Sequence, residues 1–472
     1  MADSRKNICL FCSLGCGLIV EVERDEAVSL EYDTACPVNR GKLCAKGNYI
    51  LELINHPLRL NVPRNNGTPL RWEQAAAEIA DAVSGARAKK AAGVVLSGDA
   101  SCEDVAFATA FASNCLANGN LAISFPTNDD KVVTALAGTC AGVPRATLDD
   151  VGQSACTIAV GDPFARCPVI AGRMLSARNA ARSNSLNVVS REKNMTSRFA
   201  AIHLNGSERQ MMLELVAAVL EARGGAKEGW QKPLAEGVDP HPDARRLAKS
   251  FVESEQSVVV VSADDPVVAQ LANALVKAAG DTKRLYALYD YGNARDIMEI
   301  FAGGVSTEDV INSAGRGEID LLLVLGADVV ASYPDLDVNG ALSKVKTLVA
   351  GAPFPNKTTA IAGIVLPTAL WVERDGTFNG GARRAVVEPP GAALSYGDAL
   401  KAVGKATGVE LRAPAPTKAL VEEPLDKSKA ATIASAAREA AVRPPVESTA
   451  ARFADGSLTE RVSWIKMAER VD

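Results

Sequence analysis

The chain has 472 residues and a formal net charge of −5, which leaves no broad basic surface and excludes a general nucleic-acid-binding protein. Its longest apolar stretch, 321–331, is too short to cross a bilayer, so we expect no direct membrane insertion. The first residues contain neither the apolar core of a signal peptide nor twin arginines, and we therefore expect a cytoplasmic protein.

Closely spaced cysteines distinguish the N-terminal part of the chain. Cys9, Cys12 and Cys16 lie on one short segment, and Cys36 and Cys44 follow. A [4Fe–4S] cluster requires four thiolates aimed at a common centre, and this spacing favours a cluster over a zinc site built from two C-x-x-C pairs. Spacing alone leaves the fourth ligand open, because Cys36 precedes a proline, as some cluster cysteines do. The other cysteines are expected to be small buried hydrophobic residues: Cys102, Cys115, Cys140, Cys156 and Cys167.

From residue 72 onward the sequence alternates between helix and strand patterns. A helix is expected over 72–87, followed by a buried strand within 91–101 and a helix over 103–117. Further strands, most of them ending at Gly, Asp or Pro, are expected within 156–163, 185–192, 257–266, 285–292, 319–328 and 346–354. Helical patterns separate several of them: 207–224, 243–254 and 265–279. This order predicts an α/β fold with two doubly wound parallel-sheet domains and ligands at the carboxyl ends of the strands.

These patterns divide the chain into four parts. Residues 1–60 are expected to form a small N-terminal [4Fe–4S] domain. A discontinuous α/β domain is expected over 61–120 plus 255–405, and a Rossmann-like α/β domain over 121–254 lies between its two pieces. Residues 406–472 are expected to form an extended C-terminal tail.

The tail is rich in Pro, Ala and charged residues and can bury little apolar surface by itself. From Ala413 onward we interpret it as a partner-binding arm. Trp464 is its expected anchor, because a large aromatic side chain is typical of binding hot spots.

Two segments carry a resemblance to a known family. The segments "CLFCSLGCGL" and "NRGKLCAKGNYI" resemble the N-terminal cluster domain of molybdopterin-dependent oxidoreductases, such as the formate dehydrogenase catalytic subunit and the large iron–sulfur subunit of NADH dehydrogenase. The family pattern G-x-L-C-x-K-G is matched from Gly41 to Gly47, which implies Cys44 rather than Cys36 as the fourth ligand. The resemblance also implies that Lys46 is a cofactor-binding residue between the cluster and a pterin ring. Weaker similarity continues over 157–174, 319–335 and 358–386.

The sequence departs from this family where a metal-bound pterin would be held. No Cys, selenocysteine or His lies within 119–133, where the metal ligand is expected, and Ser190 replaces an acidic residue for a guanosine ribose. The family's C-terminal dinucleotide-binding domain has no counterpart in the sequence given. Molybdopterin guanine dinucleotide is therefore not favoured as a cofactor. Asp129 and Asp130 are expected to be solvated residues at a helix start, with metal binding as their alternative role.

The favoured hypothesis is an iron–sulfur electron-transfer or scaffold subunit of a larger cytoplasmic oxidoreductase complex. Cys9, Cys12, Cys16 and Cys44 would hold its [4Fe–4S] cluster, and the chain would have no Mo or W active site of its own. The substrate-converting site would then lie outside this chain. Its partners would be other redox subunits, bearing flavin or iron–sulfur centres.

Two alternatives stay open. One is an active formate- or formyl-oxidising subunit that binds a molybdopterin or tungstopterin while a separate chain completes the site; Lys46 and the turn 374–384 favour it. Arg383 and Arg384 in this turn fit an anion contact or an exposed ion pair. The other alternative is a structural subunit stabilised by zinc, without a redox role.

Overall fold

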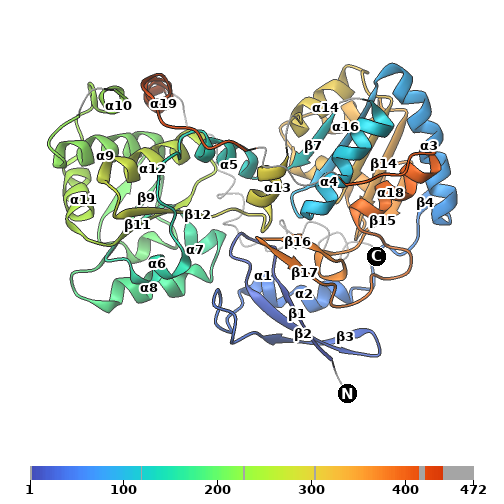
Figure 1. Ribbon diagram of the computed structural model, residues 1–472, viewed down its shortest axis with the longest axis horizontal. Helices are drawn as coiled ribbons and strands as arrows, with labels where there is room; N and C mark the ends of the chain where they lie inside the picture. The colour runs from blue at the N-terminus through green and yellow to red at the C-terminus, as the bar shows by residue number, and fades with distance from the viewer. Residues whose placement is uncertain (1–2, 118–119, 227–228, 302–303, 414–419, 440–472) are drawn as a thin grey trace.

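The computed structural model describes residues 3–117, 120–226, 229–301, 304–413 and 420–439. Figure 1 shows three parts: a small N-terminal unit, and two α/β lobes that lie side by side above it. We name the lobes by their sheets, the five-stranded lobe and the seven-stranded lobe.

The N-terminal unit is a three-stranded antiparallel sheet in the order β1-β2-β3, followed by two short helices. Its elements are β1 (Asp3–Ile8), β2 (Gly17–Glu23), β3 (Glu26–Tyr32), α1 (Ala45–Asn48) and α2 (Ile50–Ile54). Arg24 and Asp25 connect β2 to β3 with φ angles of 52° and 65°, the left-handed conformation that a two-residue hairpin turn requires. Leu18, Val20 and Leu53 form its core, so the sheet buries one face against α2 and the lobes.

The five-stranded lobe is built on a parallel sheet in the order β10-β9-β8-β11-β12. Its strands are β8 (Cys156–Gly161), β9 (Ser185–Ser190), β10 (His203–Asn205), β11 (Ser257–Ser262) and β12 (Lys283–Ala287). Val259 and Val261 pack into one core while Val258 and Val260 pack into another, because successive side chains of a strand point to opposite faces. The apolar run of β11 therefore needs helices on both sides.

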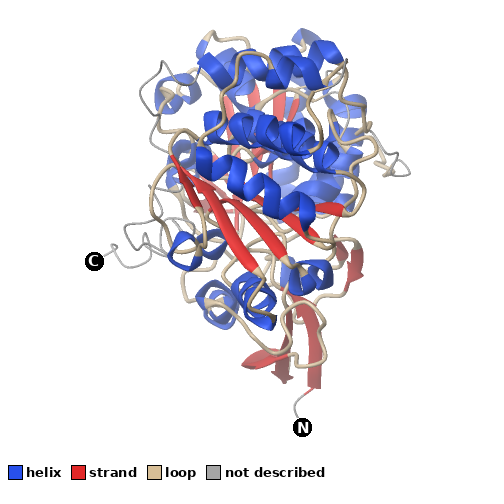
Figure 2. Ribbon diagram, turned by 90° about the vertical axis from the view of Figure 1, so that its left-hand side faces the viewer, coloured by secondary structure: helices blue, strands red, loops and turns tan. Residues whose placement is uncertain are grey.

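Helices cover both faces of this sheet. Figure 2, turned towards the five-stranded lobe, shows the strands between an upper and a lower group of helices. The upper group is α9 (Glu208–Ala222), α11 (Pro242–Glu253) and α12 (Pro266–Ala279), and the lower group is α6 (Leu148–Gln153), α7 (Pro163–Arg166) and α8 (Ile170–Ala180). The smaller elements of the lobe are η2 (Ser197–Phe199) and α10 (Gln231–Ala235).

The seven-stranded lobe has the strand order β5-β4-β15-β14-β13-β6-β7, in which β4 and β5 are antiparallel additions at one edge. Its strands are β4 (Arg64–Asn65), β5 (Thr68–Pro69), β6 (Ala92–Ser97), β7 (Leu121–Ser124), β13 (Leu321–Leu325), β14 (Thr347–Ala352) and β15 (Ile364–Pro367). The strand order reverses between β8 and β11 in the five-stranded sheet and between β6 and β13 in the seven-stranded sheet. Open α/β sheets bind their ligands at such switch points.

Helices again pack on this sheet. They are α3 (Trp72–Lys89), α4 (Cys102–Phe111) with its π-helical end η1 (Ala112–Leu116), α14 (Thr307–Gly315), α15 (Val329–Ser332), α16 (Val338–Leu342), α17 (Lys357–Ile361) and α18 (Tyr396–Ala406). The hairpin β16 (Gly376–Phe378) and β17 (Gly381–Arg383), preceded by η3 (Trp371–Glu373), reaches towards the N-terminal unit. Two further helices, α5 (Asp129–Ala137) and α13 (Ala294–Ile300), lie between the lobes. None of the described helices is both long and apolar enough to span a membrane.

The sheet pairings correct the expected division of the chain. The strand β7, at 121–124, pairs with β6 in the seven-stranded sheet, although it was assigned to the domain over 121–254. Conversely, β11 pairs with β8, and β12 pairs with β11, in the five-stranded sheet, although 255–405 was assigned to the other domain. Apolar runs identify strands, but the choice of partner strand depends on long-range packing that a local pattern does not encode.

The start of the expected extended tail is also corrected. Helix α19 (Lys427–Glu439) packs on α9, α10 and α12 of the five-stranded lobe. Leu425, Ile433 and Ala437 are buried there, so this segment covers the chain's own helices. Residues 414–419 and 440–472, which include the predicted anchor Trp464, lie outside the described residues.

A buried ion pair joins the segment after α2 to the seven-stranded lobe. The Arg59 guanidinium donates two hydrogen bonds to the Glu373 carboxylate, at 2.5 and 2.6 Å, and both side chains are almost fully buried. The carboxylate also accepts the Leu370 N–H at 2.8 Å. Removing one partner would leave the other charge buried without compensation.

We therefore expect Glu373→Gln to lower the free energy of unfolding by about 3–5 kcal/mol, as measured by urea denaturation. The matched control is Arg384→Gln, because the Arg384–Asp375 ion pair is exposed and should contribute no more than about 1 kcal/mol. Equal losses in the two variants would show that the buried pair has no special role in stability.

We expect Ile433→Ala to loosen α19, since truncating a buried Ile costs about 2–5 kcal/mol. The measurement is hydrogen exchange of the α19 amides, whose protection should fall. Thr432→Ala changes an exposed neighbour and should leave the protection unchanged. Unaltered exchange in the Ile433 variant would contradict the packing described for α19.

Candidate iron–sulfur centre

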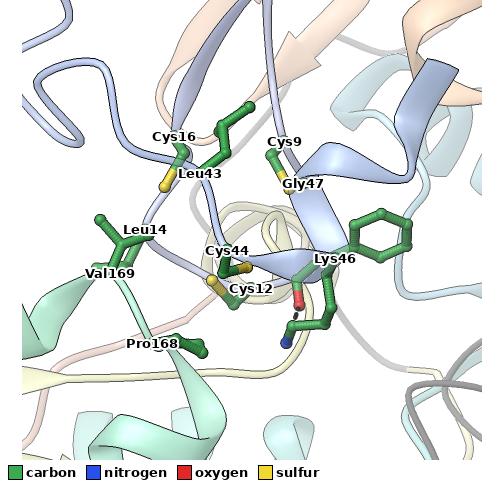
Figure 3. A pocket seen from close by; sticks show the side chains of 11 residues that line it. Cys9, Cys12, Leu14, Cys16, Leu43, Cys44, Lys46, Gly47, Pro168 and Val169 are labelled. Atoms are coloured by element: carbon green, nitrogen blue, oxygen red, sulfur yellow. Dashed lines mark hydrogen bonds between the residues drawn. The ribbon is translucent and has the colours of Figure 1, made fainter. Parts of the chain in front are cut away.

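Four cysteines of the N-terminal unit line one cavity. Cys9, Cys12 and Cys16 come from the loop between β1 and β2, and Cys44 directly precedes α1. The loop is closed by a hydrogen bond of 2.8 Å from the Cys9 N–H to the Cys16 carbonyl, which brings its ends together. Figure 3 shows the four sulfur atoms around a shared space. The structure thus brings together the set that the sequence predicted.

Cys36 lies elsewhere and does not line this cavity. It packs against Gly17, where an added Cβ would come within 2.8 Å of the Cys36 Sγ. A side chain at position 17 would therefore displace Cys36. This placement supports Cys44 over Cys36 as the fourth candidate ligand.

Burial controls the protonation of these thiols. It raises the pKa of Cys9 and of Cys16 well above the usual range for cysteine, and the neighbouring Cys12 sulfur raises both further. The pKa of Cys12 is instead lowered to about 6, chiefly by a hydrogen bond with Cys167. Thiolates this close to one another repel, and binding to a cationic centre offsets that repulsion.

The four cysteines form the set of possible ligands at this cavity. Within the part of the chain that the structure describes, no three His, Cys, Asp or Glu side chains converge closely enough to hold a single metal ion. A mononuclear zinc site needs its sulfur ligands about 2.3 Å from one ion. The four cysteines that line this cavity supply the thiolate set that a [4Fe–4S] core takes.

Lys46 connects the candidate centre to the five-stranded lobe. Its side chain is only 7% exposed, and it lines the same cavity as the four cysteines. The Nζ donates to the Phe11 carbonyl at 3.3 Å and to the Arg166 carbonyl at 3.1 Å. Lys46 thus places a buried positive charge beside the thiols, on the side that faces the lobes.

Arg166, in α7, occupies the carboxyl ends of β11 and β12. Its guanidinium donates to the Ala263 carbonyl at 3.3 Å and to the Leu288 carbonyl at 3.4 Å. It also pairs with Asp264, and with Asp290 at 3.5 Å. A protein side chain with its own counter-ions therefore lies at these strand ends.

Asp129 also lies near the carboxyl ends of these strands, and its burial shows that the prediction made for it was wrong. It was expected to be solvated, but it is 1% exposed, and its Oδ2 accepts the N–H groups of Asp290 at 2.8 Å and Tyr291 at 2.9 Å. Burial, reinforced by Asp290, raises its pKa to about 7. The segment that buries it is remote in sequence, so no local pattern could reveal the contact. Asp130, the next residue, is half-buried.

A second buried arginine lies at the switch point of the seven-stranded sheet. Arg374 donates to Asp104 at 2.9 Å and to the Asp99 carbonyl at 3.0 Å, and its guanidinium lies 4.3 Å from the Tyr396 ring centre. The Tyr396 hydroxyl donates to Asp99 at 3.0 Å. An added Cβ on Gly326, just after β13, would collide with that hydroxyl. The sequence analysis missed this cluster, because its members come from distant segments.

Ser190, which ends β9, takes part in a hydrogen bond within the protein. Its hydroxyl lies 2.8 Å from the His203 Nε2 and donates to the Glu192 carbonyl at 2.9 Å. The position where the family resemblance implies an acidic residue for a ribose therefore has a local structural role.

Comparison with known proteins agrees with this architecture. Residues 3–56 match the Molybdopterin oxidoreductase Fe4S4 domain, and residues 54–405 match the Molybdopterin oxidoreductase family. The chain belongs to the molybdopterin oxidoreductase family. The expected [4Fe–4S] domain and α/β fold are thereby confirmed, while the individual ligands stay a prediction.

Several curated relatives are distant in sequence. The F420-dependent formate dehydrogenase subunit alpha of Methanocaldococcus jannaschii is 24% identical over 82% of this chain and 68% of its own length. The NADPH-Fe(3+) oxidoreductase subunit alpha of Geobacter sulfurreducens is 24% identical over 79% of this chain and 51% of its own length. The Nitrate reductase of Symbiobacterium thermophilum is 22% identical, with 82% and 64% covered. The chain thus spans about half to two thirds of the length of these relatives.

A solved structure shares the fold. Acetylene Hydratase from Pelobacter acetylenicus superposes with a TM-score of 0.66 at 16% identity, covering 86% of this chain and 69% of the other. At this identity the similarity establishes the arrangement of the elements and leaves the chemistry of the site open.

We expect Cys44→Ser to remove the visible charge-transfer absorbance of the cluster, because Cys44 lines the cavity. Cys36→Ser is the matched control and should retain the absorbance, since Cys36 packs on Gly17 instead. Absorbance spectra of the two purified variants provide the measurement. The reverse result would show that the ligand assignment is wrong.

Proposed function

We propose that this chain is an iron–sulfur electron-transfer subunit of a larger oxidoreductase complex and that it holds no Mo or W active site of its own. One observation carries the proposal. The thiols of Cys9, Cys12, Cys16 and Cys44 surround a common cavity, whereas the strand ends where a pterin would be expected are filled by arginine–carboxylate pairs of the chain itself.

The four cysteines would hold a [4Fe–4S] cluster, which stores one electron when bound. Lys46 places its buried ammonium beside the thiols, and this charge favours the added electron. Buried Leu14 limits the access of water to the cavity. Cys44 is the one of the four cysteines that is only partly buried, and its side of the cavity is therefore the proposed point of electron exchange with a partner.

The residues near the strand ends do not suit a metal-bound pterin. Arg166 and Arg374 are both buried and paired with carboxylates, and each pair would have to be broken to admit a charged cofactor. Asp129, the alternative metal ligand, already accepts two backbone hydrogen bonds through its Oδ2.

The second candidate is an active formate- or formyl-oxidising subunit that a separate chain completes. The placement of Lys46 next to the cysteine cavity favours it, as does the similarity to a formate dehydrogenase subunit alpha. The third candidate, a zinc-stabilised structural subunit, is disfavoured by the spacing of the cysteines along the sequence, which differs from two C-x-x-C pairs.

The similar proteins support the role of a subunit. Two of them are named as alpha subunits of oxidoreductases, and this chain covers 68% of the length of one and 51% of the other. We propose that other redox subunits, bearing flavin or iron–sulfur centres, supply and remove its electrons in the cytoplasm.

The test is metal analysis of the purified full chain together with a formate-dependent dye-reduction assay. We expect iron equivalent to one [4Fe–4S] cluster per chain, no stoichiometric Mo or W, and no dye reduction. Stoichiometric Mo or W with formate-dependent activity would favour the second candidate. Zinc in place of iron would favour the third.

A further inference from the structure

Three carboxylates lie around one buried guanidinium beside the candidate iron–sulfur centre, and two of them are buried. Asp264 and Asp290 pair with Arg166, and Asp129 lies next to Asp290 at the start of α5. Asp129 and Asp290 are 1% and 7% exposed. Two buried carboxylates and the half-buried Asp264 face one guanidinium, so this cluster favours a proton on one of its buried members.

Asp129 has an oxygen suited to that proton. Its Oδ2 accepts two backbone N–H groups, whereas its Oδ1 is buried and has no hydrogen-bond partner among the described residues. A charged carboxylate oxygen without a donor is costly in the interior, and protonation lowers this cost by removing the charge. The same conclusion follows from its pKa, which burial raises to about 7.

A short backbone segment links this carboxyl group to the cysteine loop. On one side, the Ser13 N–H donates to the Tyr289 carbonyl at 3.1 Å, and the Gly292 N–H donates to the Leu10 carbonyl at 2.9 Å. On the other side, Asp129 accepts the N–H groups of the two intervening residues. A change of charge at the centre therefore acts on Asp129 across a few packed residues of low dielectric.

The charged and titratable groups around Asp129 come from several elements. Asp290, Tyr289 and Tyr291 lie on the segment after β12, Arg166 on α7, and Asp264 after β11. Lys46 and Cys12 lie on the side of the cavity. Asp130, the next residue of α5, is influenced instead by Lys131 and Glu308 at the surface. Asp290 and Arg166 are therefore the dominant neighbours.

We propose that Asp129, coupled to Asp290, binds one proton when the neighbouring iron–sulfur centre gains one electron. This inference rests on the proposed function, since it requires the cluster. A one-electron donor, such as a reduced flavin or iron–sulfur partner, or dithionite in the laboratory, supplies the electron. The proton comes from solvent and forms an O–H bond at the Asp129 Oδ1; oxidation of the centre releases both.

The coupling has a defined sign. An added electron places negative charge near the carboxyl group and raises its proton affinity, so the pKa of Asp129 is higher when the centre is reduced. Below both pKa values the proton is bound in either redox state, and the potential does not depend on pH. Between them, one proton accompanies one electron, and the potential falls by about 59 mV for each tenfold decrease in proton concentration.

The experiment is a redox titration of the full chain, monitored by electron paramagnetic resonance over the range from acidic to alkaline pH. In the unaltered protein we expect a potential that falls with pH above neutrality. Asp129→Asn keeps an oxygen for the two N–H groups but cannot bind the proton. Its potential should be independent of pH and remain near the value that the unaltered protein has at acidic pH.

Asp130→Asn is the matched control, because it changes the adjacent carboxyl group on the same helix, and it should keep the full pH dependence. Asp290→Asn is a second test that does not rely on the Asp129 variant folding, and it should weaken the dependence. A pH-independent potential in the unaltered protein, or an unchanged slope in Asp129→Asn or Asp290→Asn, overturns the inference. Absence of a cluster signal in the unaltered protein overturns the proposed function instead.

Discussion

A buried guanidinium fixes the point where three parts of this molecule meet. The backbone carbonyl of Arg166 accepts the Lys46 ammonium from the N-terminal unit, while its side chain holds the ends of β11 and β12 and two carboxylates. A single charge left unpaired in the interior costs several kcal/mol. The chain can therefore bury any one of these groups only by bringing the others to the same place. The position of the cysteine loop relative to the lobes follows from that requirement.

The sequence predicted most of the individual elements, because burial on two faces leaves a clear local pattern. The valine run of β11 and the leucine run of β13 are continuous apolar segments with turn residues after them, and both are central strands. The four-residue strand β7 has the same burial, but it is too short to give a signal. Which sheet each strand joins was predicted wrongly for β7, β11 and β12, since the pairing depends on where the chain crosses between the lobes.

The candidate site, too, was predicted only in part from the sequence. The cysteines and Lys46 are close in sequence, so a local motif placed them around one cavity. Asp129, Arg166 and Arg374 acquire their roles only from residues more than ninety positions away, such as Asp290, Asp264 and Asp104. No spacing rule connects such residues. The residues of the site that could not be predicted are those whose charges are paired with residues distant in the sequence.

The two helices between the lobes have a mechanical consequence. The chain leaves the seven-stranded lobe through α5 and returns to it through α13, and these helices pack against each other (Figure 1). Asp129 begins the outgoing helix and holds the backbone that leads into the returning one. The two segments that cross between the lobes are therefore held together at one place. Rotation of one lobe relative to the other would have to disturb the packing of α5 against α13 and the two hydrogen bonds that Asp129 accepts.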